Sequence, residues 1–144
     1  MLTVTQIRLF LRADNFMASA KSNSKILLVD DSKIACKSTA ILLEMGGHQV
    51  RTALSGGAAL EIARVYQPDV VILDLNLPDM NGYQLLKKLK ALEHLNSTTF
   101  IALTGYEPES VYTGDRHVIF DHFLQKPLDV AHLETLLLPK TSPT

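Results

Sequence analysis

The chain has 144 residues, of which 47% are hydrophobic and 20% are charged, and its formal net charge is -1. These values are typical of one soluble globular domain, and so small a charge provides no basic field for nucleic acid. A single cysteine, Cys36, excludes an internal disulfide and a cysteine-rich metal site. Apolar runs end after about four residues, whereas a membrane span needs ~20, so we expect a cytoplasmic protein without membrane contact.

Residues 1–24 precede the regular pattern and are predicted to be an N-terminal extension or linker. Arg8 and Arg12 interrupt their apolar residues, so we expect no signal peptide. Two interpretations stay open. The segment is a loosely docked extension, or it is the end of an upstream helix or a dimerising segment with Ile7 and Phe10 on one side.

From residue 25 onward, short apolar runs alternate five times with amphipathic stretches. The first, third and fourth runs are apolar at consecutive positions, which predicts strands covered on both faces. The second alternates apolar and polar residues and predicts a half-exposed edge strand, and the short fifth run predicts the other edge. The predicted strands are Lys25–Val29, Gln49–Ala53, Val70–Leu73, Phe100–Leu103 and His122–Leu124.

Amphipathic segments follow the predicted strands. In the first, Ile34, Ile41 and Met45 share a helical face, and a Gly-Gly pair ends the helix. Ser55 is the predicted N-cap of the second helix. Apolar residues at helical spacing mark this helix and two later ones: Ala59, Ile62, Ala63 and Tyr66; Leu85, Leu86, Leu89 and Leu92; Val130, Leu133, Leu136 and Leu137. The segment Glu107–Arg116 contains a glycine and few apolar residues, so it predicts only a marginal helix.

Five β-α units predict an α/β fold with a doubly wound five-stranded parallel sheet and right-handed crossovers. Apolar central strands and an alternating edge strand favour the strand order 2-1-3-4-5. Ligands of such sheets bind outside the carboxyl ends of the strands, at the point where the strand order reverses. We therefore expect the polar residues that follow the strands to share one site.

Polar or charged residues follow four of the five predicted strands. Asp30 and Asp31 follow the first strand, Asp74 the third, Thr104 the fourth and Lys126 the fifth. Three carboxylates, a hydroxyl and an ammonium group suit a divalent cation and a phosphoryl group. A helix N-cap accounts for one of the paired aspartates but not for both.

These residues carry a resemblance to the receiver domain of two-component response regulators. The matching features are the acidic pair Asp30-Asp31, the acceptor Asp74 with Pro78 and Gly82 downstream, Thr104 and Lys126-Pro127. The resemblance implies the flavodoxin-like (βα)5 receiver fold over residues 25–138 and a C-terminal tail over residues 139–144. It also implies a single-domain regulator or the receiver of a hybrid histidine kinase.

The resemblance implies that Asp74 accepts a phosphoryl group from a histidine kinase or a histidine phosphotransfer protein. Asp31 and Asp74 would bind Mg2+ directly, Asp30 would act mainly through water, and the Asn76 backbone carbonyl would complete the protein's ligands. Lys126 and the amide groups of Asn76 and Gly105 would contact the phosphoryl oxygens.

A switch is implied as well. Thr104 would move toward the phosphoryl group, and Phe123 would fill the vacated space and reshape the helix 4–strand 5–helix 5 face. The alternatives are that Thr104 completes its strand and that Phe123 packs on an edge strand. Pro127 is expected to follow a cis peptide bond. Bulky Tyr106, together with Asn76, predicts slow to moderate hydrolysis.

We therefore expect a signalling receiver and not an enzyme, with a downstream protein target or its own kinase as partner. A homodimer is possible, and no nucleic acid is expected. One alternative is an aspartyl-phosphate phosphohydrolase, which needs a second aspartate where this chain has Asn76. The other is a degenerate receiver that only binds partners, a class that typically loses an acidic residue or the lysine.

Overall fold

The computed structural model describes residues 23–105 and 119–137. The elements are β1 (Lys25–Val29), α2 (Lys33–Met45), β2 (Gln49–Ala53), α3 (Gly56–Val65), β3 (Val70–Asp74), α4 (Gly82–Lys90), the 3-10 turn η1 (Glu93–Leu95), β4 (Thr99–Thr104), β5 (His122–Gln125) and α6 (Val130–Leu137). Expectations about the N-terminal extension, the marginal helix, Tyr106 and the C-terminal tail lie outside the described residues. Within the described ranges, no helix is long and apolar enough to cross a bilayer.

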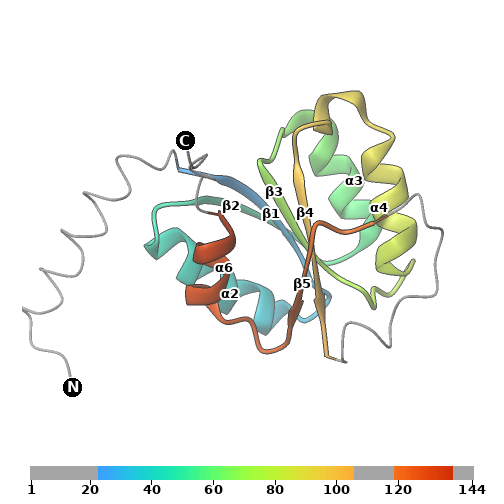
Figure 1. The fold of residues 1–144 in the computed structure, drawn as a ribbon. Helices are drawn as coiled ribbons and strands as arrows, with labels where there is room; N and C mark the ends of the chain where they lie inside the picture. The colour runs from blue at the N-terminus through green and yellow to red at the C-terminus, as the bar shows by residue number, and fades with distance from the viewer. Residues whose placement is uncertain (1–22, 106–118, 138–144) are drawn as a thin grey trace, which may run out of the picture.

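The five strands form one sheet in the order β2-β1-β3-β4-β5, and every neighbouring pair is parallel. This confirms the predicted strand order and the two predicted edges. Helices α2 and α6 cover one face of the sheet, and α3 and α4 cover the other (Figure 1). Two faces covered by helices explain why the central strands are apolar at consecutive positions.

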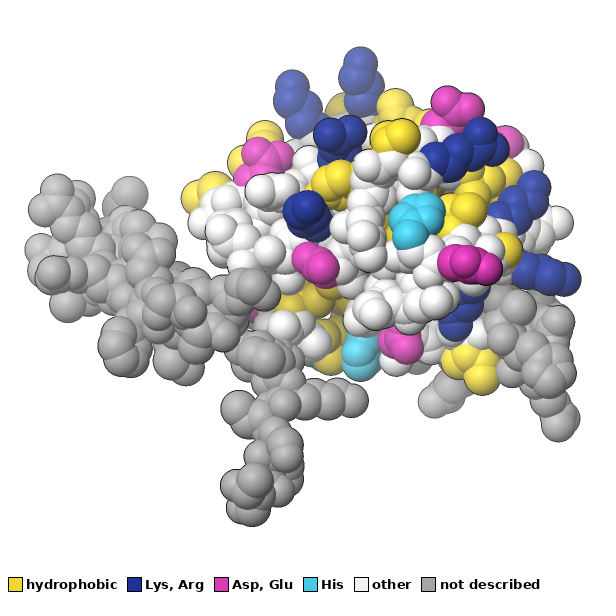
Figure 2. Space-filling view, turned by 90° about the horizontal axis from the view of Figure 1, so that it is seen from above, with side chains coloured by type: hydrophobic (Ala, Val, Ile, Leu, Met, Phe, Trp, Pro, Cys, Tyr) yellow, Lys and Arg dark blue, Asp and Glu magenta, His cyan; other side chains and the backbone are white. Residues whose placement is uncertain are grey.

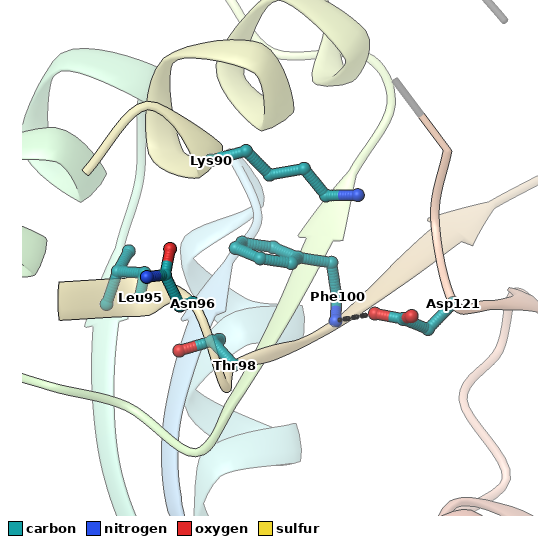
Figure 3. Close-up of a pocket in the computed structure, with 6 residues that line it drawn as sticks. All are labelled: Lys90, Leu95, Asn96, Thr98, Phe100 and Asp121. Atoms are coloured by element: carbon teal, nitrogen blue, oxygen red, sulfur yellow. Dashed lines mark hydrogen bonds between the residues drawn. The ribbon is translucent and has the colours of Figure 1, made fainter. Parts of the chain in front are cut away.

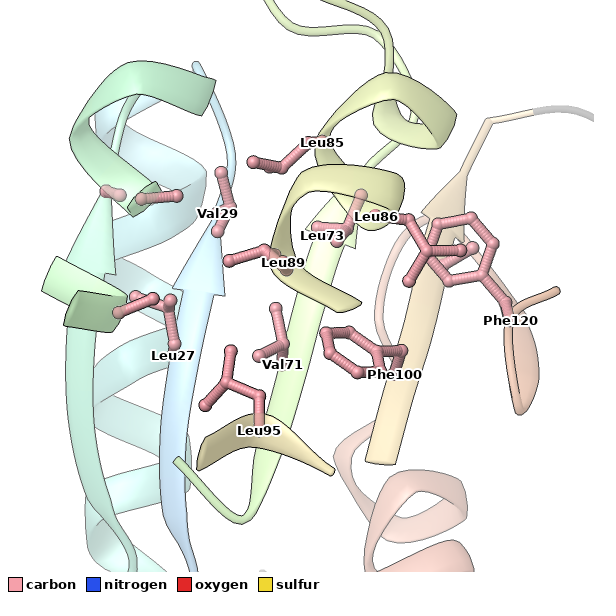
Figure 4. Close-up of a cluster of buried hydrophobic side chains, with 14 of the residues drawn as sticks. Leu27, Val29, Val71, Leu73, Leu85, Leu86, Leu89, Leu95, Phe100 and Phe120 are labelled. Carbon is pink, nitrogen blue, oxygen red and sulfur yellow. The ribbon is translucent and has the colours of Figure 1, made fainter. Parts of the chain in front are cut away.

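Successive side chains of the central strands β1, β3 and β4 enter opposite cores, because side chains alternate across a strand. On β3, Val71 and Leu73 pack against α3 and α4, whereas Val70 and Ile72 pack against α2 and α6. Figure 4 shows the first of these cores, where leucines of α4 meet residues of β1 and β3. Every residue of β3 is buried, including its last one, Asp74.

The helices begin at side-chain caps. Ser55 accepts a hydrogen bond from the Ala58 backbone N–H at 3.1 Å, which confirms it as the N-cap of α3. Helix α2 begins at Ser32, whose hydroxyl accepts from the Ala35 N–H at 3.3 Å. The N-cap of α2 is therefore a serine, and neither aspartate before it serves as the cap.

The apolar face that the sequence shows on α2 is not its buried face. Cys36, Ala40 and Leu43 face the core, while Ile34 is 82% exposed and Met45 is 75% exposed. Two of these three buried residues, Cys36 and Ala40, are small and let the helix approach the strands closely. Ile34, Ile41, Leu42 and Met45 are the large apolar residues that the helix leaves exposed.

A pair of substitutions distinguishes the two faces of α2. Leu43→Ala removes a fully buried side chain and should lower the free energy of unfolding by about 2–5 kcal/mol. Ile41→Ala acts on a half-exposed side chain, so it should cost clearly less than the buried substitution. Urea unfolding of the two variants measures the difference, and equal losses would contradict the assigned orientation of the helix.

Candidate functional site

Strand register gathers the residues at the carboxyl ends of β1, β3, β4 and β5. Val29 pairs with Leu73, so Asp30 and Asp74 are neighbours one position later at the same edge. On the other side of β3, Asp74 pairs with Leu103. The Lys126 N–H donates to the Thr104 carbonyl at 2.6 Å, which holds the end of β5 beside the end of β4. The predicted gathering of residues from distant parts of the chain is therefore present.

Asp30, Asp31 and Asp74 form an acidic cluster in which one carboxylate oxygen from each residue lies within 4.8 Å of the other two. Asp30 and Asp74 are buried and Asp31 is exposed, so the cluster opens to solvent on one side. Among the described residues, no other group of three His, Cys, Asp or Glu side chains could share an ion. An all-oxygen set of this kind fits a hard divalent cation such as Mg2+.

The ammonium group of Lys126 lies against two carboxylates of this cluster. Its Nζ donates to Asp74 Oδ2 at 2.7 Å and lies 3.6 Å from Asp30 Oδ2. Burial by itself would lower the pKa of Lys126. The hydrogen bond and charge of Asp74, followed by the charge of Asp30, outweigh burial and raise that pKa above its ordinary value. Lys126 is therefore a fixed positive charge at the phosphoacceptor candidate.

The loop after β3 contacts the same carboxylate. The Asn76 N–H donates to Asp74 Oδ1 at 2.9 Å, so each oxygen of Asp74 accepts one hydrogen bond. Farther along this loop, the Asp79 carboxylate accepts hydrogen bonds from two backbone amides of α3. Nothing in the sequence singles out Asp79, because its partners are backbone groups about 22 positions earlier.

Thr104 and Phe123 lie on the α3 and α4 side of the sheet. Phe123 pairs with Ala102 and packs against that core, and side-chain alternation places Thr104 on the same face of β4. Thr104 is only 1% exposed, and Phe123 is partly buried against Phe120, with ring centroids 5.6 Å apart. The two side chains proposed to move together thus occupy neighbouring strands of one face.

The turn residues also lie at this edge. Gly105 is exposed, and an added Cβ there would meet no other heavy atom within 4 Å. The space on the Cβ side of Gly105 is therefore open, and a phosphoryl group would have room there. The Lys126–Pro127 peptide bond is cis.

Cys36 and the histidines within the described ranges are not part of the acidic cluster. Burial, followed by the charge of Asp30, raises the pKa of the Cys36 thiol, so this side chain packs as a neutral group. His48 hydrogen-bonds to Glu134 at 2.7 Å, and His94 to the Ala63 carbonyl at 2.6 Å. These residues take part in packing contacts within the fold and not in the acidic cluster.

A hollow at the start of β4 is separate from the acidic cluster (Figure 3). It is lined by Lys90, Leu95, Asn96, Thr98, Phe100 and Asp121. Lys90 donates to the Ile119 carbonyl at 2.7 Å, and Asp121 accepts from the Phe100 N–H at 2.7 Å. Its two charged side chains are therefore already engaged within the fold.

The molecular face drawn in Figure 2 carries mixed charge. Lys and Arg side chains are interspersed there with acidic and hydrophobic ones. No extended area of a single sign of charge is visible on this face.

A family model for the response regulator receiver domain matches residues 26–138. Protein PilH of Pseudomonas aeruginosa is 33% identical over 114 residues, which cover 79% of this chain and 92% of that protein. The polar-differentiation response regulator DivK of Brucella ovis is 29% identical over 112 residues, which cover 77% of this chain and 91% of DivK.

Solved structures show the same likeness. A CheY-like response regulator receiver domain from Methylobacillus flagellatus is 36% identical, with a TM-score of 0.73 and coverage of 81% of this chain and 97% of that one. The chemotaxis response regulator CheY4 of Vibrio cholerae is 31% identical, with a TM-score of 0.73. The match covers 81% of this chain and 100% of CheY4. No enzyme family is indicated by these matches. With the acidic cluster and its lysine in place, the chain belongs to the response regulator receiver domain family.

Proposed function

We propose that this chain is the phosphoacceptor of a two-component phosphorelay and that Asp74 carries the phosphoryl group. The supporting observation is the environment of Asp74, with two more carboxylates within 4.8 Å and the Lys126 ammonium at 2.7 Å. A carboxylate oxygen of Asp74 attacks phosphorus and forms an O–P bond. The bond from phosphorus to the donor nitrogen breaks, and the donor imidazole leaves with the electron pair.

The acidic cluster fits a bound Mg2+ ion. Asp31 and Asp74 would be its direct ligands, the Asn76 backbone carbonyl would be a third, and Asp30 would act mainly through water. The donor set supports this assignment, because Mg2+ prefers oxygen ligands and keeps several waters. When bound, the ion supplies positive charge that offsets the repulsion among the carboxylates and neutralises the phosphoryl oxygens.

Groups of the protein then hold the transferred phosphoryl group. Lys126 supplies a charge-assisted hydrogen bond, and the amides of Asn76 and Gly105 donate to phosphoryl oxygens. The open space at Gly105 supports this arrangement, since an added Cβ would meet nothing there within 4 Å. Thr104 would contribute its hydroxyl from the end of β4.

The signal leaves the site through Thr104 and Phe123. If Thr104 moves toward the phosphoryl group, Phe123 fills the released space and alters the surface that β5 and α6 contribute to. The position of Thr104 and Phe123 on the same face of the sheet supports a coupled movement of the two side chains. The alternative, in which Phe123 only packs on the edge strand, is supported by its contact with Phe120.

Receiver domains interact with histidine kinases and downstream targets, and we propose such partners here, with residues 25–138 as the receiver unit. A cytoplasmic location and a homodimer stay predictions. An aspartyl-phosphate phosphohydrolase is disfavoured by Asn76, which cannot serve as the second catalytic carboxylate. A degenerate receiver is disfavoured because the three aspartates and the lysine share one site.

Phosphorylation is tested with acetyl phosphate and Mg2+. The chain should gain the mass of one phosphoryl group, and Asp74→Asn should abolish the gain because the amide is not a nucleophile. Asp69→Asn is a matched control, since Asp69 lies at the opposite end of β3 and accepts from the Lys25 N–H at 2.8 Å. Mass spectrometry measures the outcome, and labelling that survives in Asp74→Asn would reject the assignment.

Lys126→Ala separates metal binding from the phosphoryl contact. The variant should keep most of its Mg2+ affinity, because Lys126 is not one of the proposed metal ligands. The structural response to acetyl phosphate should weaken, and Lys126→Arg should retain part of it. Calorimetric Mg2+ titration and amide NMR measure the two effects, and loss of Mg2+ binding in Lys126→Ala would contradict the assigned role.

Phe123→Ala tests the switch. Asp74 should still be phosphorylated, because Phe123 makes no contact with the acidic cluster in the proposed scheme. The change in hydrogen exchange of the β5 and α6 amides on phosphorylation should shrink, whereas Phe123→Tyr should preserve it. An unchanged response in Phe123→Ala would favour simple edge-strand packing.

A further inference from the structure

The loop between β3 and α4 is closed at its base. The Gly82 N–H donates to the Leu75 carbonyl at 2.8 Å, and Asn76 and Asn81 form an antiparallel bridge. A Cβ at Gly82 would lie 2.8 Å from Leu75 Cα, so only glycine allows this closure. The two ends of the loop therefore cannot separate without breaking these contacts.

Asp79, in the same loop, is hydrogen-bonded to helix α3. Asp79 Oδ1 accepts from the Gly56 N–H at 2.9 Å, and Oδ2 accepts from the Gly57 N–H at 2.8 Å. These amides belong to the first turn of α3, where backbone donors have no partner within the helix. The hydrogen bonds from Gly56 and then Gly57 lower the pKa of Asp79, so it is a charged acceptor at neutral pH.

The loop also packs closely against the first turn of α3. A Cβ at Gly56 would lie 2.6 Å from Met80 Cγ, so the loop lies directly against the first turn of α3. The glycine pair allows the two segments to approach. Asp79 thus fixes both the distance and the orientation of the loop, because a carboxylate with two neighbouring donors has little freedom to rotate.

The loop leads back to the site. Asn76 lies three residues before Asp79, and its N–H donates to Asp74 Oδ1 at 2.9 Å. We propose that Asp79 is a positioning residue that anchors this loop on α3 and thereby holds the Asn76 carbonyl and amide in place for the metal and the phosphoryl group. The inference rests on the proposed function of Asp74.

Two alanine variants form the test. Asp79→Ala and Asp69→Ala each remove an acidic side chain that accepts backbone hydrogen bonds, but Asp69 lies at the other end of β3. Mg2+ alone is titrated into the full chain, and the amide NMR signal of Asn76 reports binding. Asp79→Ala should weaken Mg2+ affinity about tenfold, as loss of a partner that orients a metal ligand does. Asp69→Ala should leave the affinity unchanged.

The Mg2+ dependence of the phosphorylation rate is a second measurement. It would not change if Asp79 only stabilised the fold. Phosphorylation of Asp79→Ala by acetyl phosphate should be slow at limiting Mg2+ and should recover at saturating Mg2+. Asp79→Asn keeps one acceptor oxygen and should fall between the parent and Asp79→Ala. This isosteric variant preserves the test if Asp79→Ala fails to fold.

The outcomes separate the two proposals. If the parent chain binds Mg2+ and both Asp79 variants bind it equally well despite lower Tm values, Asp79 only stabilises the first turn of α3 and the inference is overturned. If the parent neither binds Mg2+ nor accepts phosphate, the proposed function fails and the inference fails with it. A tenfold loss confined to the Asp79 variants supports the positioning role.

Discussion

The structure depends on a carboxylate placed at the end of a strand that is buried along its whole length. Asp74 ends β3, the central strand of the sheet, and is itself 4% exposed. A charge so placed needs partners, since an unpaired buried carboxylate is strongly disfavoured. Lys126 and the Asn76 amide provide them. The stability of the central strand and the chemistry of the site therefore rely on the same hydrogen bonds.

The residues proposed to bind the phosphoryl group and those proposed to respond to it lie on opposite sides of the sheet. Side-chain alternation places Asp30 and Asp74 in line with the residues that face α2 and α6, while Thr104 and Phe123 belong to the side of α3 and α4. A group that binds at the carboxyl edge contacts both sides at once. Because protein cores are close-packed, the proposed shift of Thr104 would displace its neighbours.

Much of the fold follows from apolar runs and their spacing, which predict all five strands and their order. The gathering of Asp30, Asp74 and Lys126 follows as well, because parallel strands bring their carboxyl ends to one edge. The buried side of α2 cannot be predicted in this way. Ile34 belongs to an apolar face of the helix, but that face is exposed in the structure. The role of Asp79 is also hidden, because its partners are backbone amides and residue identity does not specify them.

At the carboxyl edge, three negative side chains face one ammonium group. In the proposed function, a divalent ion bound at this cluster would cancel the excess negative charge, and a transferred phosphoryl group would restore part of it. The two events are therefore thermodynamically linked, and each must change the affinity for the other by the same factor. If the proposed function holds, phosphorylation of this receiver should depend on the free magnesium level of its surroundings as well as on its donor.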